Sequence, residues 1–101
     1  LLMRVGARRP GLGLLLGATL ALGACASSGA LKRGVAAERA QDYDRAVAEY
    51  TNAVRQRPGD VSARTALERA RLRAASDHFT RGRRLAATGK PDEALVEYEL
   101  A

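Results

Sequence analysis

Apolar residues recur at helical spacing near the middle of the chain. Ala46, Tyr50 and Ala53 occupy positions i, i+4 and i+7, which places all three on one face of an α-helix. Asp42 is suited to cap the start of this helix, and Pro58 ends it because proline cannot continue a helix. The pattern therefore predicts a helix between Asp42 and Pro58 with one apolar face.

A second helix is predicted upstream, over residues 31–41, with Gly34 in its interior. Glycine inside a helix costs about 1 kcal/mol relative to alanine, so we expect it where another helix comes close. Residues 31–60 should therefore form an antiparallel helical hairpin, in which Gly34 meets Ala46 and Tyr50 fills the space beside them.

The same pattern returns 48 positions later in the chain. Six identities pair Gly34, Asp44, Ala46, Glu49, Tyr50 and Ala53 with Gly82, Asp92, Ala94, Glu97, Tyr98 and Ala101. An internal repeat of this kind builds a stack of similar units, and such stacks present binding surfaces more often than catalytic sites. We predict an all-α fold of tandem helical hairpins, with a second, incomplete hairpin over residues 75–101 of a longer protein.

These residues resemble the tetratricopeptide repeat, a family of stacked helical hairpins. Its sequence of glycine, alanine, aromatic residue, alanine and closing proline is matched by Gly34, Ala46, Tyr50, Ala53 and Pro58, and in the second copy by Gly82, Ala94, Tyr98 and Ala101. The first copy departs from the family where Ala30 and Ala37 replace bulkier residues. The resemblance implies an α-solenoid whose concave face binds protein partners through Leu31, Val35, Glu38, Arg39, Phe79, Arg83 and Ala86.

Among these candidate contacts, Leu31 and Phe79 offer apolar anchors. Arg39 and Arg83 could hold a carboxylate or an acidic segment by charge-assisted hydrogen bonds. A second hypothesis for Phe79 stays open, in which its ring packs inside the hairpin.

The offset of 48 exceeds the usual tetratricopeptide period of about 34 residues by an insert, residues 61–74. The insert has strong helix formers and no breaker, and about 14 residues make nearly four helical turns. We expect one helix over residues 61–88, with an inward face of Leu67, Ala70, Ala74, Phe79, Gly82 and Leu85 or Ala86. The alternative is a break near Ser76 and Asp77.

Residues 1–24 have the layout of a secretory signal. Arg4, Arg8 and Arg9 precede a run of uncharged, mostly apolar residues, 11–24, which is too short for a membrane-spanning helix of about 20 residues. The run leads into Leu-Gly-Ala-Cys, which resembles the lipobox of bacterial lipoproteins. That family carries its lipid on the cysteine, here Cys25. The alternative is an ordinary signal peptide with a chance cysteine.

Lipidation would make residues 25–30 the anchor and tether of the mature chain. Two or more acyl chains hold a protein stably at a bilayer without a spanning helix. Ala26 and Ser27 stand where the family's inner-membrane retention signal has aspartate. The resemblance therefore implies an outer-membrane lipoprotein that faces the periplasm.

The formal charge of +6 overstates the basic character of the mature chain, because Arg4, Arg8 and Arg9 lie in the signal and their removal leaves an excess of three. The remaining excess lies on the long helix, in Arg64, Arg69, Arg71, Arg73, Arg81, Arg83 and Arg84. Such a stripe is typical of a solvated helix face, partly paired as in Asp77–Arg81, and the alternative is contact with lipid phosphates, peptidoglycan or an acidic partner. Nucleic acid is not expected, given the export signal and few aromatic residues.

No set of residues predicts catalysis, a cofactor or a metal site. His78 has no cysteine to share a metal with, because Cys25 is assigned to lipid, and we expect His78 on the surface or in a groove. The acidic residues near 42 and 92 stand where helix starts favour negative charge. We therefore expect neither an enzyme nor a small-molecule substrate.

Three functions remain, in this order. The first is an adaptor, anchored by lipid to the outer membrane, whose repeats hold a periplasmic protein partner. The second is the N-terminal repeat region of a secretin, the channel of a type II secretion or pilus system, which the leader and repeats also resemble. The third is an accessory module of an envelope enzyme.

Overall fold

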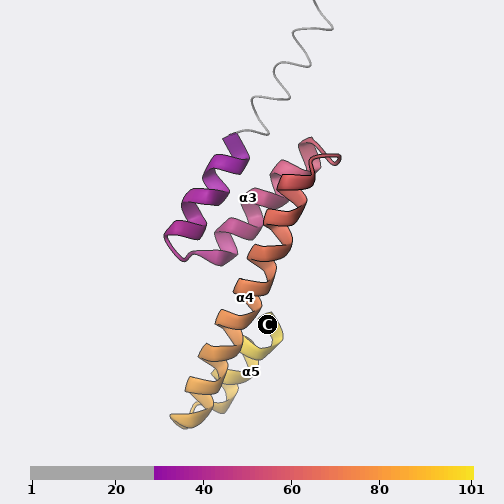
Figure 1. Ribbon diagram of the computed structural model, residues 1–101. Helices are drawn as coiled ribbons and strands as arrows, with labels where there is room; N and C mark the ends of the chain where they lie inside the picture. The colour runs from indigo at the N-terminus through magenta and orange to yellow at the C-terminus, as the bar shows by residue number, and fades with distance from the viewer. Residues whose placement is uncertain (1–28) are drawn as a thin grey trace, which may run out of the picture.

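The computed structural model describes residues 29–101, and this part of the chain is helical apart from short turns (Figure 1). A first helix covers residues 29–39, and three more follow it: α3 (Tyr43–Gln56), α4 (Val61–Ala87) and α5 (Pro91–Leu100). The predicted all-α fold is confirmed for these residues. The predicted signal peptide, residues 1–24, and the predicted lipid site at Cys25 lie outside them.

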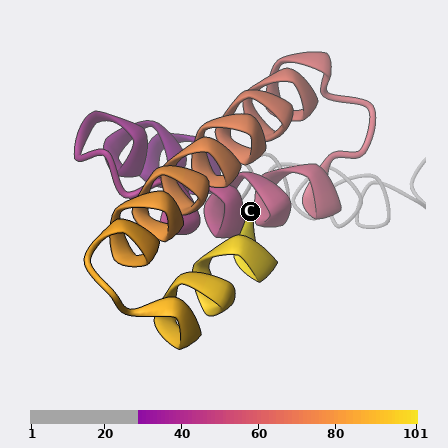
Figure 2. The ribbon, with the colours of Figure 1, turned by 90° about the horizontal axis from the view of Figure 1, so that it is seen from below.

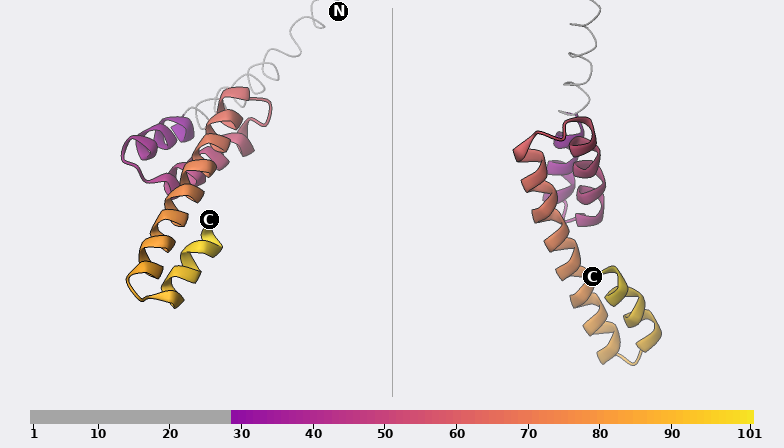
Figure 3. Two further views of the ribbon diagram at one scale, coloured as in Figure 1. Left: turned by 60° about the horizontal axis from the view of Figure 1, so that its bottom comes forward. Right: turned by 90° about the vertical axis from the view of Figure 1, so that its right-hand side faces the viewer.

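The long helix α4 is the element against which the others pack. α3 runs antiparallel to its N-terminal half and α5 antiparallel to its C-terminal half (Figures 1 and 3). The helix at 29–39 lies beside α3, and the view from below shows α5 packed on the far end of α4 (Figure 2). We call helix 29–39 with α3 the first hairpin, and residues 75–87 of α4 with α5 the second hairpin.

Helix α4 is continuous through Ser76 and Asp77, as the absence of a breaker in the insert predicts. It begins where the Asp60 carboxylate accepts hydrogen bonds from the backbone N–H groups of Ser62 (3.0 Å) and Ala63 (3.2 Å). Asp42 caps α3 in the same way, by accepting from an N–H one turn later. The insert thus lengthens a helix, and its buried face is formed by Ala63, Ala66, Leu67, Ala70, Ala74, His78 and Gly82.

One glycine–tyrosine contact closes each hairpin. The fully buried ring of Tyr50 lies so close to the Gly34 backbone that any β-carbon there would overlap it. The ring of Tyr98 crowds Gly82 in the same way. Tyr50 thus fills the space beside Gly34, as the sequence predicts, and it belongs to the same buried cluster as Ala46. The sequence repeat is therefore also a repeat of one packing contact.

The turns inside the two hairpins are also equivalent. Gln41 and Gly89 stand 48 residues apart, and each adopts the left-handed backbone conformation, with φ of 58° and 79°. Glycine enters this region freely, whereas other residues pay about 1–2 kcal/mol. The first hairpin therefore carries backbone strain at Gln41 that the second avoids.

Candidate functional site

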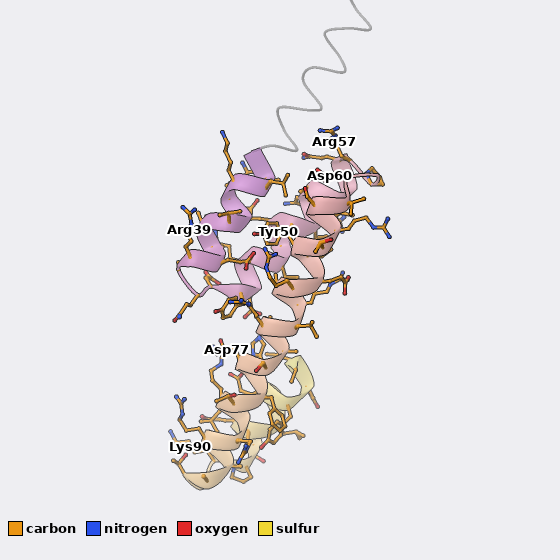
Figure 4. The ribbon with its side chains drawn as sticks, viewed as in Figure 1. Arg39, Tyr50, Arg57, Asp60, Asp77 and Lys90 are labelled. Atoms are coloured by element: carbon orange, nitrogen blue, oxygen red, sulfur yellow. The ribbon has the colours of Figure 1, made fainter. Side chains whose placement is uncertain are left out.

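The outward face of helix 29–39 carries a shallow hollow that combines apolar and basic side chains. Leu31, Val35 and Ala36 supply the apolar surface, and Lys32 and Arg39 supply the cations. Val35 is 40 % exposed, and Arg39 points away from α3 (Figure 4). Within residues 29–101 neither cation is held in an ion pair. The structure thus brings three predicted contact residues, at positions 31, 35 and 39, to one open surface. We call it the first-helix hollow.

Glu38, a fourth predicted contact residue, is used inside the fold. Its Oε1 accepts hydrogen bonds from Arg69 Nη2 at 2.7 Å and from the Tyr50 hydroxyl at 2.5 Å. The Arg69 hydrogen bond holds the pKa of Glu38 below its ordinary value, and burial together with Glu38 raises the pKa of Tyr50 to about 12. Glu38 therefore ties helix 29–39 to α3 and α4, and its assignment to partner binding is corrected to a structural one.

The predicted contacts of the second hairpin lie on its surface. Phe79 is 51 % exposed and rests at 43° against the ring of Tyr98, with 5.7 Å between centroids. Arg83 and Ala86 are exposed on α4. The prediction that Phe79 points inward is wrong, as is the hypothesis that it packs inside the hairpin, and Ala86 does not face inward either. The buried side chains in this part of α4 recur every four residues, at Ala74, His78 and Gly82. Position 79 therefore lies outside the buried face.

His78 is buried, which overturns its predicted place on the surface or in a groove. Its side chain is 8 % exposed, and its two ring nitrogens lie beside carboxylates from two other helices. Nδ1 lies 2.7 Å from Glu97 Oε2 on α5, and Nε2 lies 2.9 Å from Asp44 Oδ1 on α3. Figure 4 labels Asp77, the residue that precedes His78 on α4, and so shows where along this helix the histidine lies. A polar residue can be buried here because both of its nitrogens have partners.

Charge around the imidazole favours its protonated form. The hydrogen bonds to Glu97 and Asp44 raise the pKa of His78 above its ordinary value, and the His78 hydrogen bond lowers the pKa of Glu97. Arg81 also approaches, with Nη2 2.9 Å from the Nδ1 atom of His78. We call His78, Asp44, Glu97 and Arg81 the histidine junction.

An arginine–glutamate pair recurs in both hairpins at the offset of 48. Arg33 Nε lies 2.9 Å from Glu49 Oε2 in the first hairpin, and Arg81 Nε lies 3.4 Å from Glu97 Oε2 in the second. Ala30 stands at the place equivalent to His78. The histidine is therefore a local addition to a repeated ion pair. The identity of Arg33 and Arg81 at the same offset was a signal for this pair in the sequence.

Most of the arginine stripe on α4 has intramolecular partners. Arg69 binds Glu38, Arg71 pairs with Glu68 at 2.9 Å, and Arg81 pairs with Asp77 at 3.5 Å, the last as predicted. The guanidinium of Arg73 lies 5.9 Å from the Tyr43 ring centroid. In the described residues this leaves Arg64, Arg73, Arg83 and Arg84 without an ion pair, and of these Arg73 has the contact with the tyrosine ring. Much of the stripe therefore stabilises the fold.

A second, larger hollow lies where α3 and α4 meet near the turn that joins them. Val54, Val61 and Leu67 line it together with charged side chains of α4. Its cations are Arg64 and Arg71, and Arg71 is neutralised by its pair with Glu68. The hollow is therefore less suited to an acidic ligand than the first-helix hollow, although Val61 is 72 % exposed there.

Searches for metal sites and membrane spans within residues 29–101, and for related proteins, found none of these. Within residues 29–101, histidine, cysteine and carboxylate side chains form no group of three that could hold a metal ion. No helix of the described part has the length and apolar character needed to cross a membrane. No model of a known protein family matches the chain, and no curated protein or solved structure matches it.

Proposed function

We propose that this chain is a protein-binding adaptor of the tetratricopeptide type, held at the bacterial outer membrane by lipid on Cys25 and facing the periplasm. The observation that carries the binding role is the first-helix hollow. Its cations have no carboxylate partner within residues 29–101, whereas Arg69, Arg71 and Arg81 of α4 each have one. The partner is expected to present an apolar side chain next to carboxylates.

The two sides of helix 29–39 have different roles, and this difference supports the proposal. Gly34, Tyr50 and Glu38 face the interior and hold the hairpin to α4. The opposite side of the same helix carries Val35 and Arg39, which contribute nothing comparable to the fold. Exposed apolar surface beside unpaired cations is the composition of a binding face, because exposed apolar patches mark interaction sites and arginine is enriched among the residues that dominate interface energies.

The anchor predicts one covalent lipid site. Cells labelled with radioactive palmitate should incorporate label into the wild-type chain and none into a Cys25→Ser variant, because the lipid is attached through the cysteine sulfur. Equal labelling of both chains would contradict the lipoprotein part of the proposal and leave the binding part to its own test.

The binding face predicts where a partner can be crosslinked. A photoreactive amino acid at Val35 should give a discrete crosslinked product in intact cells, because this side chain is exposed within the first-helix hollow. Matched probes at Asn52, on the exposed side of α3, and at Val61, in the hollow between α3 and α4, should give none.

Each other outcome of the crosslinking counts against the proposed face. A product at Val61 alone would move the partner to the second hollow. The same product at Asn52 and Val35 would indicate contact without a defined site. A product at none of the positions, with normal amounts of folded protein, would contradict the adaptor role.

A further inference from the structure

The second hairpin leaves a group of large apolar side chains open to solvent. Phe79 on α4 is 51 % exposed, Leu95 on α5 is 58 % exposed, and the Tyr98 ring that rests against Phe79 is 38 % exposed. Ala86 follows Phe79 by seven residues and therefore lies on the same side of α4, as Leu95 and Tyr98 share a side of α5. We call Phe79, Ala86, Leu95 and Tyr98 the second-hairpin face. It lies toward the end of α4 that is remote from the first hairpin (Figure 3).

The first hairpin shows how the equivalent surface is covered. The counterparts of the three large side chains, 48 positions earlier, are Leu31, Val47 and Tyr50. All three pack in one apolar cluster with the N-terminal half of α4, which contributes Ala66, Leu67 and Ala70. Within residues 29–101 no third helix buries the corresponding side chains of the second hairpin. The second-hairpin face is therefore a surface for helix packing that lacks its cover.

Charges of opposite sign flank this face on its two helices. Arg83 lies one turn beyond Phe79 on the same side of α4, and Glu99 lies one turn beyond Leu95 on the same side of α5. Both side chains are exposed, and neither has an ion pair within residues 29–101. Asp92, seven residues before Glu99, adds a second carboxylate on that side of α5. The α4 edge of the face is thus basic and its α5 edge is acidic.

An apolar centre with one basic and one acidic edge is complementary to a second copy of itself. A two-fold axis parallel to the two helices sets the basic edge of each copy against the acidic edge of the other, and brings the apolar centres together. We propose that the second-hairpin face joins two copies of this chain in a symmetric dimer. The dimer uses other residues than the first-helix hollow, so it is tested independently of the adaptor role.

A second copy fits the face better than a helix like the one that covers the first hairpin. The covering segment, residues 61–74, binds Glu38 through Arg69. Ala86 stands at the position equivalent to Glu38, so an arginine placed there would find no carboxylate and would lie near Arg83. A partner of one charge sign would meet a like charge at one of the two edges, which disfavours binding. Only a partner with edges of both signs satisfies the face, and the chain itself carries such a surface.

A crosslink tests whether two copies meet at this face. In cells that produce two differently tagged copies of the full chain, a photoreactive amino acid at Leu95 should give a product that carries both tags. Val96 provides the matched control, because it is 56 % exposed and points about 100° further around α5. A probe at Val96 should give little or none of this product. A product that joins Leu95 to an unlike protein, or no product at all, would overturn the dimer.

Charge reversal then tests the proposed pairing of the edges. With the probe at Leu95, Arg83→Glu and Glu99→Lys should each lower the yield of the doubly tagged product by about fivefold, because symmetry places each reversed charge at two contacts. Co-expression of one tagged copy with Arg83→Glu and the other with Glu99→Lys should restore the yield, since both edges are complementary again. Arg84→Glu makes the same charge change on the other side of α4 and should leave the yield unchanged. Failure of the mixed pair to recover, or an equal loss with Arg84→Glu, would contradict the dimer.

Discussion

Replacing Tyr50 with alanine is expected to lower the free energy of unfolding by about 3–5 kcal/mol, the range for truncating a fully buried aromatic residue. The ring is wholly inaccessible to solvent, it fills the space left by Gly34, and its hydroxyl donates to Glu38. Alanine would leave a cavity at the crossing of the two helices and remove one donor from a carboxylate that also binds Arg69. The first hairpin should separate from α4.

The second hairpin provides the matched control, because Tyr98 makes the same contact with Gly82 and remains 38 % exposed. Tyr98→Ala should cost about 1 kcal/mol, since truncating a partly exposed side chain loses fewer contacts and leaves an opening that water can enter. Urea denaturation followed by circular dichroism at pH 6 measures both variants. If both variants lose the same free energy of unfolding, the different burial of Tyr50 and Tyr98 does not determine their contributions to stability.

The hairpins could be predicted from the sequence because their signals are local. The i, i+4, i+7 spacing of Ala46, Tyr50 and Ala53 identifies the buried face of α3, and all three side chains are inaccessible to solvent. The continuity of α4 follows from an insert without helix breakers. Capping by Asp42 and Asp60 depends on hydrogen bonds that span only two or three residues.

The junction could not be predicted, because its contacts join residues far apart in the chain. His78 meets Asp44 from 34 positions away and Glu97 from 19. Burial of a histidine is favourable only when such partners exist, and without them an apolar neighbour is the better candidate for the interior. The sequence therefore favours Phe79 on the inside and His78 on the surface, although the four-residue spacing from Ala74 to Gly82 passes through His78.

The prediction that Glu38 contacts a partner is wrong for a related reason. Alignment with a repeat family assigns positions on a helix face but says nothing about which of them the fold itself uses. Glu38 falls on the predicted binding face, yet Arg69 reaches it from 31 residues away. The insert that lengthens α4 brings this arginine to the first hairpin. Val35 and Arg39 have no such neighbour and remain on the open surface.

Reversing the two charges of the first-helix hollow is expected to weaken binding of the crosslinked partner at least tenfold, or about 1.4 kcal/mol. Lys32→Glu with Arg39→Glu replaces both cations that line the hollow by carboxylates, so attraction for an acidic segment becomes repulsion. Neither side chain forms an ion pair within the described residues, so the fold should keep its stability. Arg55→Glu with Arg57→Glu makes the same change in net charge at exposed positions around the end of α3.

The dissociation constant of that partner, measured for the wild type and for both double variants, tests the central claim most directly. The predicted result is a loss of at least tenfold for the pair at 32 and 39, and little change for the pair at 55 and 57, with equal helicity in all three proteins. Equal weakening by both pairs would mean that net charge alone attracts the partner. Unchanged affinity in the 32 and 39 variant would contradict the first-helix hollow as the binding site.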